Sequence, residues 1–168
     1  MALPRKLKDM NLFSEGNEYK GTASSVTLPK LARKLEEYRG AGMDGTVKLD
    51  MGAEPMEMEF TLGGPDLSIL RQYALPGLAG TYLRFSGAWQ QEDTGTVDTI
   101  EIIVRGRYEE LDFGEAKMGE GGEFKCKFAL VYYRLDWNGQ EAIEIDVLAG
   151  VHRVAGVDRL AEITAAVS

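Results

Sequence analysis

The chain has 168 residues, of which 44% are hydrophobic and 27% charged, values typical of one soluble globular domain with a substantial core. Its 19 Lys and Arg against 27 Asp and Glu give a net charge of −8. This charge argues against tightly held nucleic acid, because phosphate binding needs clustered lysine and arginine side chains. The single cysteine excludes an internal disulfide, and we expect no membrane segment, since no stretch approaches about 20 apolar residues. The basic start is followed by no long apolar run, so it does not resemble a secretory signal.

Residues 1–16 show no clear periodicity and are expected to form an N-terminal arm. Two interpretations stay open: a disordered terminus, or an arm that a neighbouring subunit orders. The apolar pair Leu12 and Phe13 favours the second interpretation.

Short strands are predicted next, over residues 25–28, 34–38, 46–51 and 54–62. The pattern around Gly52 and Ala53 is compatible with a hairpin between the last two of them. Residues 40–45 are rich in glycine and are predicted to be a flexible connector.

A helix is predicted over residues 66–75, with Asp66 as its N-cap and Pro76 after its end. Long strands are expected over residues 81–91, 97–108, 123–137 and 140–148, and a short helix over residues 157–166. Within residues 123–137 the apolar positions change from even to odd, which requires a bulge or a strand that passes between sheets. These elements predict a mainly β, antiparallel barrel or sandwich of two packed sheets, with one central and one C-terminal helix.

The strands carry acidic residues on one side and apolar residues on the other. In residues 56–62 the even positions are apolar and Glu57 and Glu59 lie between them, and residues 143–147 repeat the pattern. His152 has no partner set, and Cys126 is expected to be a buried core residue of a protein kept in a reducing compartment. We therefore predict no enzymatic activity, no metal and no cofactor.

Several ordered segments carry a family resemblance. They are residues 11–13, 25–31, 37–44, 132–135, 143–146 and 156–161. In this order and at this length the chain resembles the major tail tube protein of contractile-tailed bacteriophages, and it is similar to the tube protein of R-type pyocins. No single motif is chemically diagnostic, and the resemblance runs nearly end to end.

The resemblance implies a structural subunit of a phage or phage-like tail. In such proteins hexameric rings stack into a hollow tube inside a contractile sheath, and strands of the six protomers close a larger β-barrel around the lumen. The implied partners are further copies of the chain, the tail sheath protein, and the baseplate, tail-terminator and tape-measure proteins. DNA would pass without specific binding. The implied location is the virion, after assembly in the bacterial host cytoplasm.

Acidic strand faces suit a channel for DNA, because carboxylates repel phosphates within a Debye length of about 10 Å. The candidates for lining the lumen are Glu57, Glu59, Glu101, Glu144 and Asp146. The candidates for contact between rings are Leu12, Phe13, Met43, Asp44, Val47, Leu49 and Met51. The alternation defines polar faces without assigning which face lines the lumen, and phage, prophage and tailocin stay open as the parent particle.

Two other functions are compatible with the pattern. A soluble β-barrel could bind a small ligand in an apolar cavity, as lipocalin-like barrels do. A hydrolase could use two of the many carboxylates, although Glu57 and Glu59 on a regular strand are better explained as a solvated face.

Overall fold

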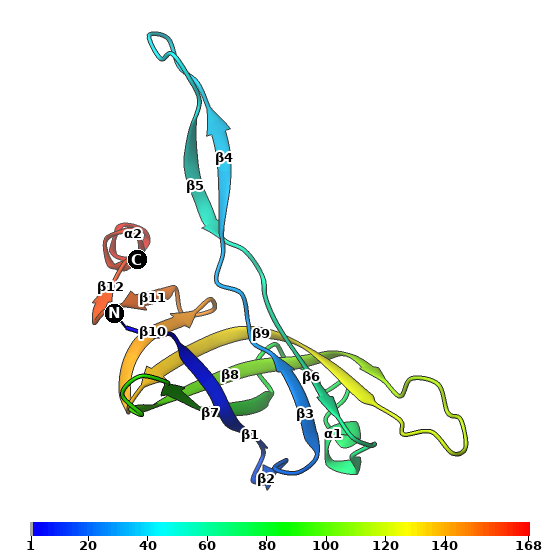
Figure 1. The fold of residues 1–168 in the computed structure, drawn as a ribbon. Coiled ribbons are helices and arrows are strands. Elements are labelled where there is room, and N and C mark those ends of the chain that lie inside the picture. Colours follow the sequence, from blue (N-terminus) through cyan, green and yellow to red (C-terminus); the bar gives the residue numbers. More distant parts are fainter. Residues whose placement is uncertain (1) are drawn as a thin grey trace.

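The computed structural model describes residues 2–168 and is built mainly of antiparallel β-strands (Figure 1). The strands in chain order are β1 (Arg5–Ser14), β2 (Asn17–Glu18), β3 (Ala23–Thr27), β4 (Arg33–Tyr38), β5 (Val47–Ala53), β6 (Met56–Leu62), β7 (Thr81–Gln91), β8 (Val97–Asp112), β9 (Phe124–Trp137), β10 (Gln140–Asp146), β11 (Val151–Val154) and β12 (Val157–Asp158). The two short helices are α1 (Leu67–Arg71) and α2 (Ala161–Val167). The predicted mainly β, antiparallel fold with two short helices is confirmed.

One sheet contains all the strands except β4 and β5. Its order is β12-β11-β10-β9-β8-β7-β1-β2, and β6 and β3 join it at β9. Strand β9 is the branch point, because its first half pairs with β6 and its second half with β10. The two expected sheets are thus branches of one forked sheet, and both branches contribute to one buried core.

The core fills with large side chains from facing strands. Phe60, Phe85 and Phe128 are at most 1% exposed. Tyr108 meets Phe60 and Phe128 edge-on, with ring centroids 6.3 and 5.3 Å away. Aromatic side chains in such edge-to-face contacts stabilise the core beyond the area they bury.

A bulge in β9 explains the change of apolar parity. Its buried residues are Phe124, Cys126, Phe128 and Leu130, followed by Tyr133. Opposite them, the register with β8 shifts between Arg105 and Gly106, which pair with Tyr132 and Leu130 and leave Val131 without a partner in that ladder. Of the two predicted explanations, the bulge is present, and β9 also pairs with both branches of the sheet. A Cβ on Gly106 would lie 2.0 Å from the Ala129 carbonyl oxygen, so the bulge needs glycine there.

The N-terminal segment differs from the prediction. Residues 5–14 are not an arm but strand β1, which pairs with β7 from Arg5 opposite Gln91 to Ser14 opposite Leu83. This pairing joins residues that are far apart in the sequence, from Arg5 with Gln91 to Ser14 with Leu83, so no local pattern revealed it.

The predicted hairpin of residues 46–51 and 54–62 is wrong. β5 pairs with β4, and β6 pairs with β3 and β9 instead. Residues 40–45, predicted as a flexible connector, form the turn at the tip of the β4–β5 hairpin, where the Met43 N–H donates to the Gly40 carbonyl at 3.2 Å.

Both helices are displaced or shortened relative to the prediction. The helix expected over residues 66–75 ends at Arg71, and Ala74 has a φ of +61°, outside the right-handed helical region. Its start is as predicted, since the Asp66 side chain accepts from the Ile69 N–H at 3.1 Å. Of the helix expected over residues 157–166, the first two residues form β12 and the helix begins at Ala161.

Candidate functional site

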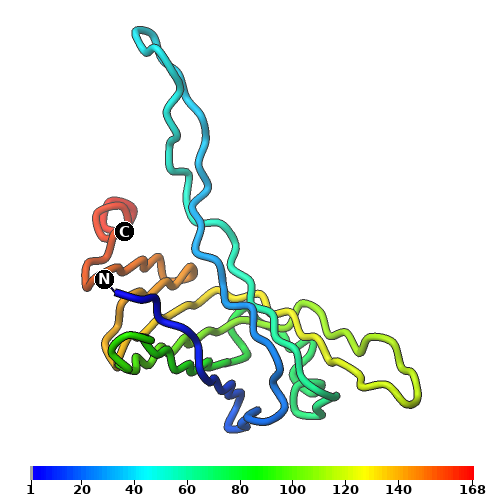
Figure 2. Tube along the Cα trace, viewed as in Figure 1, coloured from blue at the N-terminus to red at the C-terminus, as the bar shows by residue number. Residues whose placement is uncertain are grey.

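The β4–β5 hairpin projects far from the body of the molecule (Figures 1 and 2). None of the core residues comes from either of its strands. Paired residues share a face in an antiparallel ladder, so Tyr38 opposite Val47 and Glu36 opposite Leu49 lie on one side, with Met51 two residues further along. The side chains Tyr38, Val47, Leu49 and Met51 form what we call the apolar stripe, and they are 54%, 46%, 45% and 55% exposed.

The opposite face of the hairpin is mainly polar. It carries Glu37 opposite Lys48 and Leu35 opposite Asp50. Leu35 is 51% exposed, which makes it the one large apolar side chain of the described hairpin on that face. The hairpin is therefore amphipathic, although neither face is covered by its own chain.

The tip and the base of the hairpin are held by local hydrogen bonds. At the tip, Arg39 Nε donates to the Met43 carbonyl at 3.1 Å, and Asp44 is exposed beside it. At the base, Arg33 Nε lies 2.9 Å from Asp50 Oδ2, and the Glu54 N–H donates to the Ala32 carbonyl at 3.0 Å. Of the predicted ring contacts, Met43, Asp44, Val47, Leu49 and Met51 all lie on this projection.

Leu12 and Phe13 are placed elsewhere. The prediction that Leu12 contacts another ring is wrong, because Leu12 is 0% exposed in the core of its own chain. Phe13 lies on the other side of β1, half-buried, with the Arg84 guanidinium 4.0 Å from its ring centroid. Phe13 thus packs within its own chain beneath an arginine.

The five predicted lumen acids share the outward face of the forked sheet. Their neighbours along the strands, such as Met58, Phe60, Ile102 and Ile145, are buried, so the acids point away from the core. They form two groups on either side of the β9 bulge. The first group is Glu57 and Glu59 on β6, and the second is Glu101 on β8 with Glu144 and Asp146 on β10.

Most of these acids have a basic partner. Glu101 lies 3.0 Å from Arg84, and Glu57 lies 3.6 Å from Lys127. Glu144 lies 2.7 Å from Arg153. Glu144 also accepts from the Tyr132 hydroxyl at 2.8 Å, and the pKa of Tyr132 is raised to about 12 by burial first and by this hydrogen bond next.

The other two acids lack such partners within residues 2–168. Asp146 accepts from the Ala149 N–H at 3.1 Å, and no side-chain hydrogen bond or ion pair is found for Glu59 in the described chain. The Glu109 and Glu57 carboxylates, in that order, raise the pKa of Lys127, so this lysine keeps its charge beside β6. The outward face therefore has mixed charges, whereas the sequence had predicted rows of acid alone.

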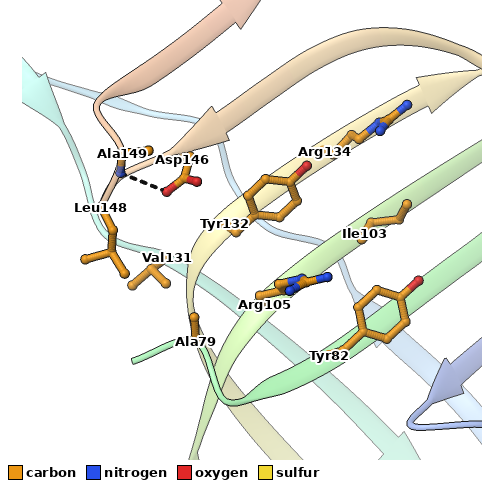
Figure 3. Close-up of a pocket in the computed structure, with 10 residues that line it drawn as sticks. All are labelled: Ala79, Tyr82, Ile103, Arg105, Val131, Tyr132, Arg134, Asp146, Leu148 and Ala149. Carbon is orange, nitrogen blue, oxygen red and sulfur yellow. Dashed lines mark hydrogen bonds between the residues drawn. The ribbon is translucent and has the colours of Figure 1, made fainter. Parts of the chain in front are cut away.

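A hollow of about 730 Å³ lies on this outward face (Figure 3). Tyr132 and Arg134 project into it from β9, with Arg105 from β8, Tyr82 from β7 and Asp146 at the end of β10. The lining mixes charged, aromatic and aliphatic groups on open strands, and the protein's interior is filled by the aromatic core instead of an apolar cavity. The geometry does not favour a small-ligand barrel.

The groups needed for chemistry are sparse in the described chain. Across residues 2–168 no cluster of three His, Cys, Asp or Glu could hold a metal ion. Cys126 is 2% exposed, and burial raises the pKa of its thiol to about 12. Its predicted burial is confirmed, and a neutral buried thiol is a poor nucleophile. Neither described helix is long and apolar enough to cross a membrane.

Comparisons with known proteins agree with each other. The family model described as "Phage tail tube protein FII" matches residues 4–167. The tail tube protein of Escherichia phage P2 is 48% identical over 163 residues, covering 95% of each chain. The major tail tube protein of Serratia phage KSP20 is 34% identical over 158 residues, covering 93% of this chain and 91% of the relative.

A solved structure shares the fold. The sheath/tube terminator of an extracellular contractile injection system, PVC, in the extended state, superposes with a TM-score of 0.57. The match covers 79% of this chain and 96% of the terminator, at 12% identity.

Proposed function

The chain belongs to the phage tail tube protein FII family, and from this premise we propose that its copies close into hexameric rings that stack into the hollow tube of a contractile tail. The family is a structural one and not an enzyme family, so the chain is a structural component of the virion tail. From the same premise we propose that the tube lies inside a contractile sheath. Its proposed partners are the tail sheath protein and the baseplate, tail-terminator and tape-measure proteins.

The observation that carries the stacking proposal is the uncovered apolar stripe of the β4–β5 hairpin. Covering its four half-exposed side chains would contribute about 3–6 kcal/mol, since full burial of one large apolar side chain is worth about 1.5–3 kcal/mol. Association costs about 4–15 kcal/mol of rigid-body freedom, so one hairpin contact alone would be weak. When one ring of six copies stacks on another, six hairpin contacts form, but the rigid-body freedom of the ring is lost only once. The stacked arrangement is therefore stable.

The lumen proposal rests on the outward face of the forked sheet. All five predicted acids point from this face, and three of them are paired with arginine or lysine. Paired charges present little net field beyond a Debye length of about 10 Å. Passing DNA would therefore be neither bound through its phosphates nor strongly repelled. We propose that this low-adhesion wall forms the conduit, with Glu59 as the acid that most influences the DNA.

Electron microscopy of the purified full chain tests the proposal. Negative-stain images over rising concentration should show rings and then rods with a stain-filled bore. A chain that remains monomeric at the highest concentration, or that forms solid particles, would refute the tube.

A further inference from the structure

The hairpin is joined to the body through two chain segments and one described side-chain hydrogen bond. Two chain segments, residues 28–32 and 54–55, connect it to the rest of the sheet. Among the described residues, the one side-chain hydrogen bond from residues 33–53 to the body runs between Arg33 Nη1 and His152 Nδ1, at 3.5 Å. This contact is therefore the point at which the described side-chain hydrogen bonds tie the hairpin to the body.

Each partner of this contact is anchored on its own side. Arg33 belongs to β4 and is held by the Asp50 carboxylate across the hairpin, at 2.9 Å. His152 belongs to β11, opposite Ile145, and its backbone N–H donates to Asp158 at 3.1 Å. The arginine thus reaches from the hairpin to a fixed point on the body.

The contact requires an uncharged imidazole. Arginine can only donate, so His152 Nδ1 must accept with its lone pair and the ring proton must lie on Nε2. Protonation at Nδ1 would turn the acceptor into a donor and place two cations side by side.

The surroundings of His152 favour the uncharged form. The ring borders a largely apolar groove of about 230 Å³ between the hairpin base and strands β10 and β11. The charged groups around it are Arg33 from β4, Asp50 from β5, Glu54 from the segment before β6, Asp158 from β12 and Arg159 after it. Burial and the Arg33 charge lower the pKa of His152 from its ordinary 6.5, whereas Asp158 and Asp50 act in the opposite direction.

We infer that the Arg33–His152 contact is a latch that fixes the direction in which the β4–β5 hairpin leaves the body, and that acidification opens it. With the latch closed, the pKa of His152 is below 6.5, and with the hairpin swung away it returns toward 6.5. Protons therefore bind the open form better, so the closed form is most favoured above pH 6.5 and loses that advantage as the pH falls below it. Each unit of pKa difference changes the closed-to-open ratio about tenfold.

This latch rests on the proposed function only for its consequence in a tube, where a swinging hairpin would weaken the contact between rings. The latch itself is tested in single copies of the full chain. Spin labels on Asp44→Cys at the hairpin tip and Asp93→Cys in the β7–β8 turn report the distance between hairpin and body, and the buried Cys126 stays in place unlabelled. The pulsed electron resonance measurement is made where the chain sediments as single copies.

The expected result is a narrow distance distribution at pH 7.5 that broadens or splits at pH 5. In His152→Gln the distribution should be the same at both pH values, because an amide does not titrate there. Arg33→Gln removes the contact from the other side and should abolish the pH response as well. An unchanged distribution in the unsubstituted chain, or the same response in both variants, overturns the latch. A chain that never forms rods would defeat the tube proposal without affecting this result.

Discussion

Replacing Leu49 with glutamine tests the apolar stripe at its centre. The side chain is 45% exposed in the single copy, so covering it in a neighbouring ring is worth about 1 kcal/mol, and burying an unpaired amide in its place costs about 1–3 kcal/mol. Each contact should therefore lose about 2–4 kcal/mol, and 2 kcal/mol alone is about a 30-fold loss of affinity. Weakening all six contacts of the proposed ring by this amount should prevent stacking, while ring closure persists.

The matched control is Leu35→Gln, because Leu35 is 51% exposed on the opposite face of the same hairpin. Sedimentation velocity and negative-stain microscopy at matched concentrations should show rings without rods for Leu49→Gln and rods for Leu35→Gln. Both variants should unfold at the urea midpoint of the parent chain, since neither side chain belongs to the core. Equal rod formation by the two variants, or equal loss, would refute the assignment of the stacking contact to the stripe.

Three further predictions concern the body of the molecule. Gly106→Ala should lower the free energy of unfolding in urea by about 3 kcal/mol, because the new Cβ meets the Ala129 carbonyl. Gly121→Ala, in open space, should leave it unchanged. Equal urea midpoints for the two variants would contradict the bulge geometry. Cys126 should resist thiol reagents at pH 8 until the chain unfolds, since burial raises its pKa to about 12, and rapid native labelling would disprove that burial. Glu59→Lys should leave rods intact and slow genome ejection, and an assembled mutant tube with unchanged ejection would remove Glu59 from the lumen.

The sequence predicted best where one strand face is buried and glycines or polar turns mark the ends. β7 occupies the predicted residues 81–91, because Leu83 and Phe85 alternate with Arg84 and Ser86 between clear turns. The parity change in β9 likewise predicted a bulge or a strand that passes between sheets, since buried positions move from Cys126 to Tyr133 within one strand.

The pairing of distant segments could not be predicted from periodicity. β5 alternates as a core strand would, yet both of its faces are exposed, so the pattern suggested the wrong partner. The partners of the acids also escaped prediction. Arg153 lies on β11, next to Glu144 on β10, and only the strand register brings their side chains within 2.7 Å.

The separation of the β4–β5 hairpin from the core has a consequence for divergence among relatives. Substitutions along it leave the folding of the body almost untouched, so this segment can change in step with whatever surface receives it. Exchanging the hairpin between two related subunits should therefore exchange the surface that each subunit recognises, while the fold of each body stays the same.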